Sequence, residues 1–242
     1  MKVEIWSDVV CAWCAIGRRR FEEALSRFAH HDAVEVQWRA FELDPSATST
    51  PAGQPIASNA HAVRLATKIG IPVEQAEQIH GDVARLAEIE GLALRFDLTV
   101  PANTAAAHQI IHLAALRGVQ GAVAERLVQG HWTEGEAIGD PEVLVRLASE
   151  GGLAPEEVRA ALTEDRYLDA VRSDEAEAVA LGASGVPFYV IDRRYGVSGA
   201  QSVEQYLALL ERVWEETHPT TLITNTAEKT KTGMCGPDNC SI

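Results

Sequence analysis

The sequence predicts an α/β protein in which a long helical segment interrupts a sheet. Strand-like runs occur only near the two ends of the 242-residue chain, and the middle is rich in the helix formers Ala, Leu, Glu and Gln. Breaks at glycine and proline divide residues 59–171 into five or six helices without a convincing strand. We therefore expect strands from both ends of the chain to share one sheet, with a helical domain inserted between them.

The first part of the chain, residues 1–45, has the pattern of a strand, a helix and a second strand. Residues 3–6 are rich in β-formers, residues 16–28 carry apolar side chains at helical spacing, and residues 34–38 alternate between apolar and polar. This order predicts a parallel pair of strands joined by a helix. A loop rich in Pro, Ser, Thr and Gly follows at residues 45–58.

Strand signals return in the second part, residues 172–217. Residues 187–192 (PFYVID) and 195–198 flank a two-residue turn and predict a hairpin. Residues 202–216 again place apolar side chains at helical spacing, which predicts a final helix. The polar, Thr-rich residues 218–242 are expected to form a flexible tail.

Charge and composition exclude some classes of partner. Hydrophobic residues make up 46% of the chain and the formal net charge is -14, which is typical of a globular protein and unsuited to nucleic acid or anionic lipid. No apolar run approaches the roughly 20 residues that span a bilayer, and the start MKVEIWSDVV lacks the pattern of a signal peptide. We therefore expect a cytoplasmic protein with no membrane or nucleic-acid partner. A cysteine pair in that compartment indicates catalysis, redox sensing or metal binding.

Cys11 and Cys14 carry most of the functional information. They follow a predicted strand and open a predicted helix, where free N–H groups and the helix dipole favour an anion. The thiolate is the form of cysteine that attacks a disulfide. A spacing of three residues, about one helical turn, places both sulfurs on one face. We expect Cys11 to be an exposed nucleophile and Cys14 to resolve the mixed disulfide from within the helix.

The spacing alone leaves other interpretations of this pair open. The two cysteines could be buried core residues, or half of a zinc site. A third hypothesis is a metal-binding protein that uses all four cysteines of the chain, including Cys235 and Cys240, although the spacing of that second pair is unusual for a metal site. We expect no metal ion.

The segment WSDVVCAWCAIGRRRFE around the first pair resembles the DsbA-like thioredoxin superfamily, and within it the cytoplasmic FrnE-like branch. Matching stretches follow in the same order along nearly the whole chain, at residues 101–108, 133–140, 184–191 and 195–201. The resemblance implies a thioredoxin fold with an all-helical domain inserted between its halves. It also implies a dithiol oxidoreductase or disulfide isomerase that acts on protein or small-molecule disulfides.

The same resemblance assigns a role to the start of the predicted hairpin. It implies a cis peptide bond between Val186 and Pro187 beside the cysteines, with the Val186 backbone offered to an extended substrate chain. It implies no organic cofactor, and it leaves glutathione as a co-substrate and a homodimer open. Relatives often carry Pro and Tyr where this chain has Ala12 and Ala15, so the redox potential is not predicted.

Further features near the first pair are Asp8, two tryptophans and a basic run. Asp8 is a candidate proton shuttle for the resolving step, or a turn residue or helix cap. Trp13 is expected at the rim around the sulfurs, where it contacts substrate, and Trp6 in the core. The basic run of residues 18–20 is expected on a solvated helix face.

Residues in the helical segment add further candidates. Asn103, Thr104 and His108 match a stretch that lines the active-site cleft in related isomerases, so we expect Asn103 and His108 to contact substrate. Asn103 or Thr104 would equally well cap the helix after Pro101. His108 and His112 are four residues apart and could bind a metal, but no further ligand is evident.

Cys235 and Cys240 enclose Gly-Pro-Asp-Asn, four strong turn formers that can bring the sulfurs to bridging distance. The FrnE-like resemblance includes a second pair of this kind. Our hypothesis is an auxiliary redox pair that exchanges electrons with Cys11 and Cys14, within one chain or across a dimer. The alternative is a tail that binds metal or oxidises adventitiously.

A second function fits the same architecture. Kappa-class glutathione transferases and 2-hydroxychromene-2-carboxylate isomerases share it, and they typically activate glutathione with a serine near the position of Cys11. The presence of both cysteines disfavours this class.

Electron exchange between the two pairs predicts a covalent intermediate. In a Cys14→Ala protein, Cys11 has no resolving partner, so we expect a trapped mixed disulfide between Cys11 and Cys235 or Cys240, detected by peptide mass mapping. Unchanged turnover after deletion of residues 233–242 would show instead that the tail takes no part in catalysis.

Overall fold

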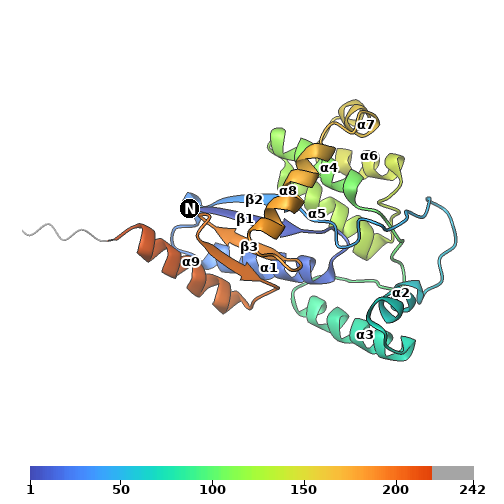
Figure 1. Cartoon of the computed structure of the whole chain (residues 1–242), viewed down its shortest axis with the longest axis horizontal. Coiled ribbons are helices and arrows are strands. Elements are labelled where there is room, and N and C mark those ends of the chain that lie inside the picture. Colours follow the sequence, from blue (N-terminus) through green and yellow to red (C-terminus); the bar gives the residue numbers. More distant parts are fainter. Residues whose placement is uncertain (220–242) are drawn as a thin grey trace, which may run out of the picture.

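The computed structural model, which describes residues 1–219, is built on a mixed four-stranded sheet (Figure 1). The strand order is β2-β1-β3-β4, in which β1 pairs parallel with β2 and antiparallel with β3, and β3 pairs antiparallel with β4. The strands are β1 Lys2–Ser7, β2 Glu35–Ala40, β3 Phe188–Ile191 and β4 Tyr195–Ser198. The expected parallel pair and the expected hairpin are therefore confirmed, and β1 joins them.

Two helices cover one face of the sheet. Helix α1, Ala12–Arg27, leads from β1 to β2 through a short 3-10 turn at His31–Ala33, and α9, Val203–Thr217, packs beside α1. The alternation of β1 turns Val3 and Ile5 towards this face. There they pack into an apolar cluster with side chains of both helices and of β3, among them Phe21, Phe28, Tyr189, Tyr206 and Leu210.

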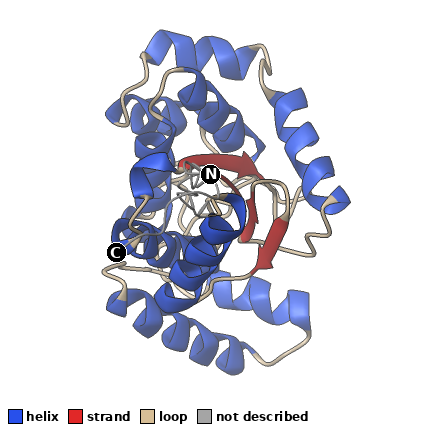
Figure 2. Cartoon of the chain, turned by 90° about the vertical axis from the view of Figure 1, so that its left-hand side faces the viewer, coloured by secondary structure: helices blue, strands red, loops and turns tan. Residues whose placement is uncertain are grey.

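The opposite face of the sheet is covered by α8, Leu168–Ala180. Trp6 of β1 and Val190 of β3 form a small buried cluster there with Ala178 of α8. Figure 2 shows the sheet enclosed among helices. Because both faces of β1 are buried, this strand fixes the position of the loop that follows it, and that loop leads to Cys11.

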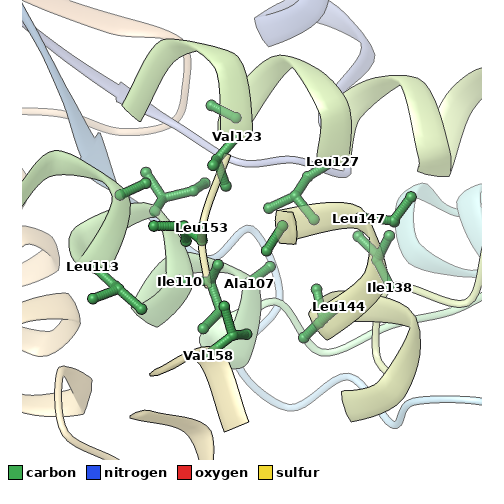
Figure 3. Close-up of a cluster of buried hydrophobic side chains, with 14 of the residues drawn as sticks. Ala107, Ile110, Leu113, Val123, Leu127, Ile138, Leu144, Leu147, Leu153 and Val158 are labelled. Atoms are coloured by element: carbon green, nitrogen blue, oxygen red, sulfur yellow. The ribbon is translucent and has the colours of Figure 1, made fainter. Parts of the chain in front are cut away.

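The segment between β2 and β3 is helical, as the sequence predicts. Its helices before α8 are α2 Ala60–Ile69, α3 Val73–Ile89, α4 Ala105–Leu116, α5 Gln120–Gln129, α6 Pro141–Glu150 and α7 Pro155–Thr163, with a π-helical turn at Gly130–Glu134. Helices α4 to α7 enclose a core of their own, which includes Ile110, Leu113, Leu127 and Leu147 (Figure 3). None of the helices within residues 1–219 combines the length and apolar character needed to cross a bilayer.

Two details differ from the sequence interpretation. Helix α8 runs through residue 171, so the boundary expected there lies inside a helix. The run at residues 18–20 is not a freely solvated face, because Arg18 is buried, stacks over Trp38 and pairs with Glu22. A charge pattern alone does not reveal that the α5 helix covers this part of α1.

A buried polar network lies between the sheet and α8. Asp174 of α8 accepts hydrogen bonds from the Ala40 N–H and the Arg39 guanidinium, both at 2.9 Å, and its Oδ2 lies 3.0 Å from His112 Nε2. Burial alone would raise the pKa of Asp174, but His112, the Ala40 N–H and Arg39 outweigh it, so the pKa of this carboxyl is lowered. Glu4 of β1 also pairs with Arg39. The ionised carboxylate of Asp174 therefore links the edge strand β2 to the helical segment.

The Asp174→Asn substitution should destabilise the fold by about 2 kcal/mol or more at neutral pH, because it removes the charge from a buried pair. A lowered pKa means that the contribution is complete above about pH 4 and is lost as the pH falls through the folded-state value, so the difference between the two proteins should shrink in acid. Urea unfolding at several pH values measures it.

The exposed Asp169 of the same helix offers the matched control, since Asp169→Asn removes a carboxylate that has no ion pair among the described residues. Equal losses from the two substitutions at neutral pH would contradict the role given to Asp174.

Candidate active site

The two cysteines lie where β1 ends and α1 begins. Cys11 is the N-cap residue of α1, and its Sγ accepts a hydrogen bond from the Cys14 N–H at 3.2 Å. The Cys11 N–H in turn donates to the Asp8 carbonyl at 3.1 Å, which closes the loop between strand and helix. The sulfur of Cys11 therefore occupies the position at which a helix start stabilises negative charge.

Both cysteines are free thiols, and both are largely covered. Cys11 is 7% exposed and Cys14 is 3% exposed. The expectation of a freely exposed Cys11 is therefore wrong, because the start of α1 is enclosed by neighbouring segments of the fold. Burial, together with hydrogen bonding and charge at Cys11, raises the pKa of Cys14 well above its usual value. The two sulfurs thus differ in character, and Cys14 is held as a protonated thiol.

The start of the hairpin faces Cys11. The peptide bond between Val186 and Pro187 is cis, and the Cys11 thiol donates to the Val186 carbonyl at 3.7 Å. Val186 is half-buried and Pro187 is buried. The structure therefore places both residues beside the first cysteine, although they lie far from it in the sequence.

Gly17 allows this loop to approach α1 closely. A Cβ at this position would lie 2.9 Å from Tyr189 Oη and 3.2 Å from Pro187 Cγ. Neither contact leaves room for a methyl group without movement of the helix or of the loop. The glycine is thus one reason why the hairpin can lie against the first turns of α1.

Trp13 lies between the two cysteines in the sequence and is 43% exposed, so its indole is at the surface. A second tryptophan has a different role that the sequence interpretation missed. Trp132 is buried, and its Nε1 donates to the Val9 carbonyl at 3.0 Å. This bond ties the loop before Cys11 to the helical segment. The only sequence signal is the position of Trp132 just before the matched stretch at residues 133–140.

Asp8 and His108 meet in the interior behind the cysteines. Asp8 is buried, and its Oδ2 accepts from the Leu43 N–H at 2.8 Å. Its Oδ1 lies 3.4 Å from Nε2 of His108, which is 2% exposed. The His108 ring therefore faces Asp8 rather than the surface, so we do not retain it as a direct substrate contact.

Asn103 is used within the chain. Its Oδ1 accepts from the Ala105 N–H at 3.1 Å at the start of α4, and its Nδ2 donates to the Pro45 carbonyl at 3.1 Å. The side chain thus bonds to the first N–H of the helix and holds the loop after β2. The N-cap itself is Thr104, whose side chain makes no capping hydrogen bond, so Asn103 supports the helix start from the residue before the cap.

His108 and His112 do not face a common point. His108 lies against Asp8, whereas His112 lies against Asp174. Within residues 1–219, no three side chains of the His, Cys, Asp or Glu type are grouped as a metal site would require. Cys235 and Cys240 lie outside the described residues.

Comparisons with known proteins point to one family. A family model, the DSBA-like thioredoxin domain, matches residues 2–211. The crystal structure of a probable DsbA oxidoreductase from Streptomyces coelicolor has 41% sequence identity, covers 100% of this chain and 99% of its own, and superposes with a TM-score of 0.82. Protein YwbO of Bacillus subtilis is 28% identical over 196 residues, which are 78% of this chain and 86% of the relative.

More distant structures share the fold. The cytosolic disulfide reductase DsbM from Pseudomonas aeruginosa, solved with GSH, has 21% identity and a TM-score of 0.60, covering 89% of this chain and 100% of its own. A 2-hydroxychromene-2-carboxylate isomerase has 15% identity and a TM-score of 0.60, covering 90% of this chain and 98% of its own. At these identities the likeness concerns the fold alone.

The close approach at Gly17 generates a prediction. Gly17→Ala should destabilise the protein by about 1–3 kcal/mol, because the added methyl group forces α1 and the hairpin apart. Chemical denaturation measures the loss, and the alkylation rate of Cys11 reports the change beside the sulfur.

Gly121 of α5 is the matched control, because a Cβ there meets nothing within 4 Å. Gly121→Ala should leave stability unchanged or raise it by about 0.5–1 kcal/mol, as expected for alanine in a helix. A Gly17→Ala protein as stable as the Gly121→Ala protein would show that the contact at Gly17 is not tight.

Proposed function

Because this chain belongs to the DSBA-like thioredoxin domain family, we propose that it is a thiol–disulfide oxidoreductase in which Cys11 attacks and Cys14 resolves. The family model and the Streptomyces coelicolor structure establish the thioredoxin fold with its helical insertion. The observation that carries the proposal is the hydrogen bond from the Cys14 N–H to Cys11 Sγ, at the first turn of α1. It favours negative charge on Cys11 and leaves Cys14 as the thiol.

In the first step, the Cys11 thiolate attacks one sulfur of a substrate disulfide. The bond between the two substrate sulfurs breaks, one substrate sulfur leaves as a thiolate, and the other remains bound to Cys11 as a mixed disulfide. The helix start stabilises the reactive sulfur before the attack, and the thiolate is the form that reacts.

In the second step, Cys14 loses its proton and attacks Cys11 Sγ. A disulfide forms between Cys11 and Cys14, and the second substrate sulfur leaves with the bonding electron pair. The substrate disulfide is thereby reduced, and the dithiol of the protein is oxidised. The position of Cys14 inside the first turn of α1 supports this role, because the backbone holds it one turn from Cys11.

We propose that the substrate disulfide lies between Trp13 and the loop at Val186. Trp13, in the first turn of α1, supplies an exposed aromatic surface, and the Val186 carbonyl lies 3.7 Å from Cys11 Sγ. A half-buried strand start offers backbone groups with which an extended peptide can pair. We propose protein disulfides or small-molecule disulfides as substrates. After the protein has reduced a substrate, a thiol such as glutathione would reduce the Cys11–Cys14 disulfide and restore the dithiol. We propose the cytoplasm as the compartment in which the protein works.

The alternative is a glutathione-dependent transferase or isomerase on the same fold. The likeness to the chromene-carboxylate isomerase concerns only the fold, and the N-cap position here holds a cysteine instead of a serine. Conjugation of glutathione to an electrophile separates the two functions, because an oxidoreductase has no need to catalyse it.

Substitution of each cysteine should separate the two steps. Cys11→Ser should lower insulin reduction by at least about 100-fold, because serine does not provide a nucleophile for a disulfide near neutral pH. Cys14→Ser should also abolish turnover, but it should accumulate a mixed disulfide on Cys11, which intact-mass analysis detects.

Unfolding curves of both variants show whether the fold is kept. Insulin reduction by Cys11→Ser at the wild-type rate would overturn the proposed function. A Cys14→Ser protein that turns over normally would overturn only the assignment of Cys14 as the resolving residue.

A further inference from the structure

The resolving thiol has little direct access to solvent through which to lose its proton. Cys14 is 3% exposed, and its pKa is raised well above the usual value, first by burial and then by Cys11. In the second step of the proposed reaction this proton must leave before or as the sulfur attacks. The interior on the far side of Cys14 must therefore provide an acceptor, unless the resolving step waits for hydroxide.

A small cavity of about 30 Å³ adjoins Cys14 on that side. Its lining includes Asp8, His108, Arg18 and Arg39, together with apolar side chains such as Trp38 and Ile111. A cavity of this size can hold a water molecule where two or more polar groups face it. One water molecule in this cavity would link the Cys14 thiol to the polar groups deeper in the protein.

Two buried groups on the cavity have unused hydrogen-bonding capacity. His108 Nε2 is buried and has no hydrogen-bond partner among the described residues. Asp8 Oδ1 lies 3.4 Å from it, and its other contact, to the Val10 N–H, is long at 3.5 Å. A buried nitrogen without a partner is costly. His112 Nε2 also lacks a hydrogen-bond partner by the same criterion within residues 1–219, and His108 differs from it in lining the cavity that adjoins Cys14.

We propose that His108, oriented and electrostatically supported by Asp8, is the base that takes the proton of Cys14 during the resolving step. The proposal rests on the proposed function and adds to it a residue from the helical insertion. His108 acts on Cys14 through a water in the cavity, and Asp8 stabilises the imidazolium that forms.

The bonds and charges of this step balance. The S–H bond of Cys14 breaks, and its proton passes through the water to His108. The Cys14 sulfur then attacks Cys11 Sγ, and the captured substrate sulfur leaves as a thiolate with the bonding electron pair. The proton stays on His108 beside Asp8 until the Cys11–Cys14 disulfide is reduced again, when the departing Cys14 thiolate takes it back through the same water. The substrate thiolate takes its proton from solvent.

The other charged groups near the cavity are less suited to this role. Arg18 is engaged by Glu22 and by the Gly121 carbonyl, and Arg39 by Glu4 and Asp174. Both are cations that cannot accept a proton.

Burial lowers the pKa of His131 to about 4, and the negative charge of Asp8 offsets this effect only in part. A histidine with that pKa is a weak base, and His131 does not line the cavity that Cys14 adjoins. His108 is thus the histidine that the geometry favours.

The test measures the two steps separately in single turnovers of the reduced full-length protein with oxidised glutathione. In His108→Gln, capture of glutathione on Cys11 should proceed within about twofold of wild type, whereas formation of the internal disulfide should slow by at least about tenfold. Mass analysis of quenched samples follows the glutathione adduct on Cys11. The slowed step should also become proportional to hydroxide concentration, a change that loss of packing alone does not produce.

His112→Gln is the matched control, because His112 lies one turn further along α4 and faces Asp174 instead of Asp8. It should resolve the adduct at the wild-type rate. Asp8→Asn should slow the same step as His108→Gln. If neither Asp8→Asn nor His108→Gln folds, the test uses wild type in mixtures of light and heavy water. The rate constant of the resolving step is plotted against the deuterium fraction of the solvent. A relay that moves more than one proton gives a curved plot, and direct loss of a single proton gives a straight line.

Normal capture with resolution at the wild-type rate in a folded His108→Gln protein would overturn the relay and leave the oxidoreductase proposal intact. A straight deuterium dependence in wild type would also overturn it. If the wild-type protein failed to capture glutathione on Cys11, that result would instead contradict the proposed function itself.

Discussion

The hydrogen bond from the Cys14 N–H to Cys11 Sγ is the interaction on which the rest of the site depends. It exists because Cys11 is the N-cap of α1, and that position is set by a strand buried on both faces and by the bond from Trp132 to the Val9 carbonyl. The same turn that favours charge on one sulfur buries the other. In the proposed reaction, backbone geometry thereby gives two chemically identical side chains different roles.

The sequence predicted the parts of the fold that follow from local pattern. The run of β-formers in β1, the alternation in β2, the helical spacing in α1 and α9, and the turn between β3 and β4 are signals that neighbouring residues reinforce. The placement of Cys11 at a helix start could be predicted for the same reason. The ends of α8 could not, because that helix is amphipathic only weakly and is held by its contacts with α4 and β2.

The parts of the site that could not be predicted are those made by contacts between distant segments. Nothing near Asp8 in the sequence indicates that His108 lies against it, and nothing near Val9 indicates Trp132. His108 matched a stretch associated with substrate contact, yet its ring is turned inward. Burial is decided by which helices pack together, and a local pattern does not determine the partner of a polar side chain.

The strand order has a consequence for how the protein is made. Ile5 of β1 pairs with Trp38 on one side and with Tyr189 on the other, so its second neighbour is synthesised only after the whole helical segment. Contacts between such distant residues are slow to form. Before β3 and β4 are synthesised, the two cysteines lack the hairpin that faces them in the folded protein. Both sulfurs of a nascent chain are therefore accessible to oxidants and to other thiols. The order of synthesis thus delays the covering of the two cysteines until β3 has been made.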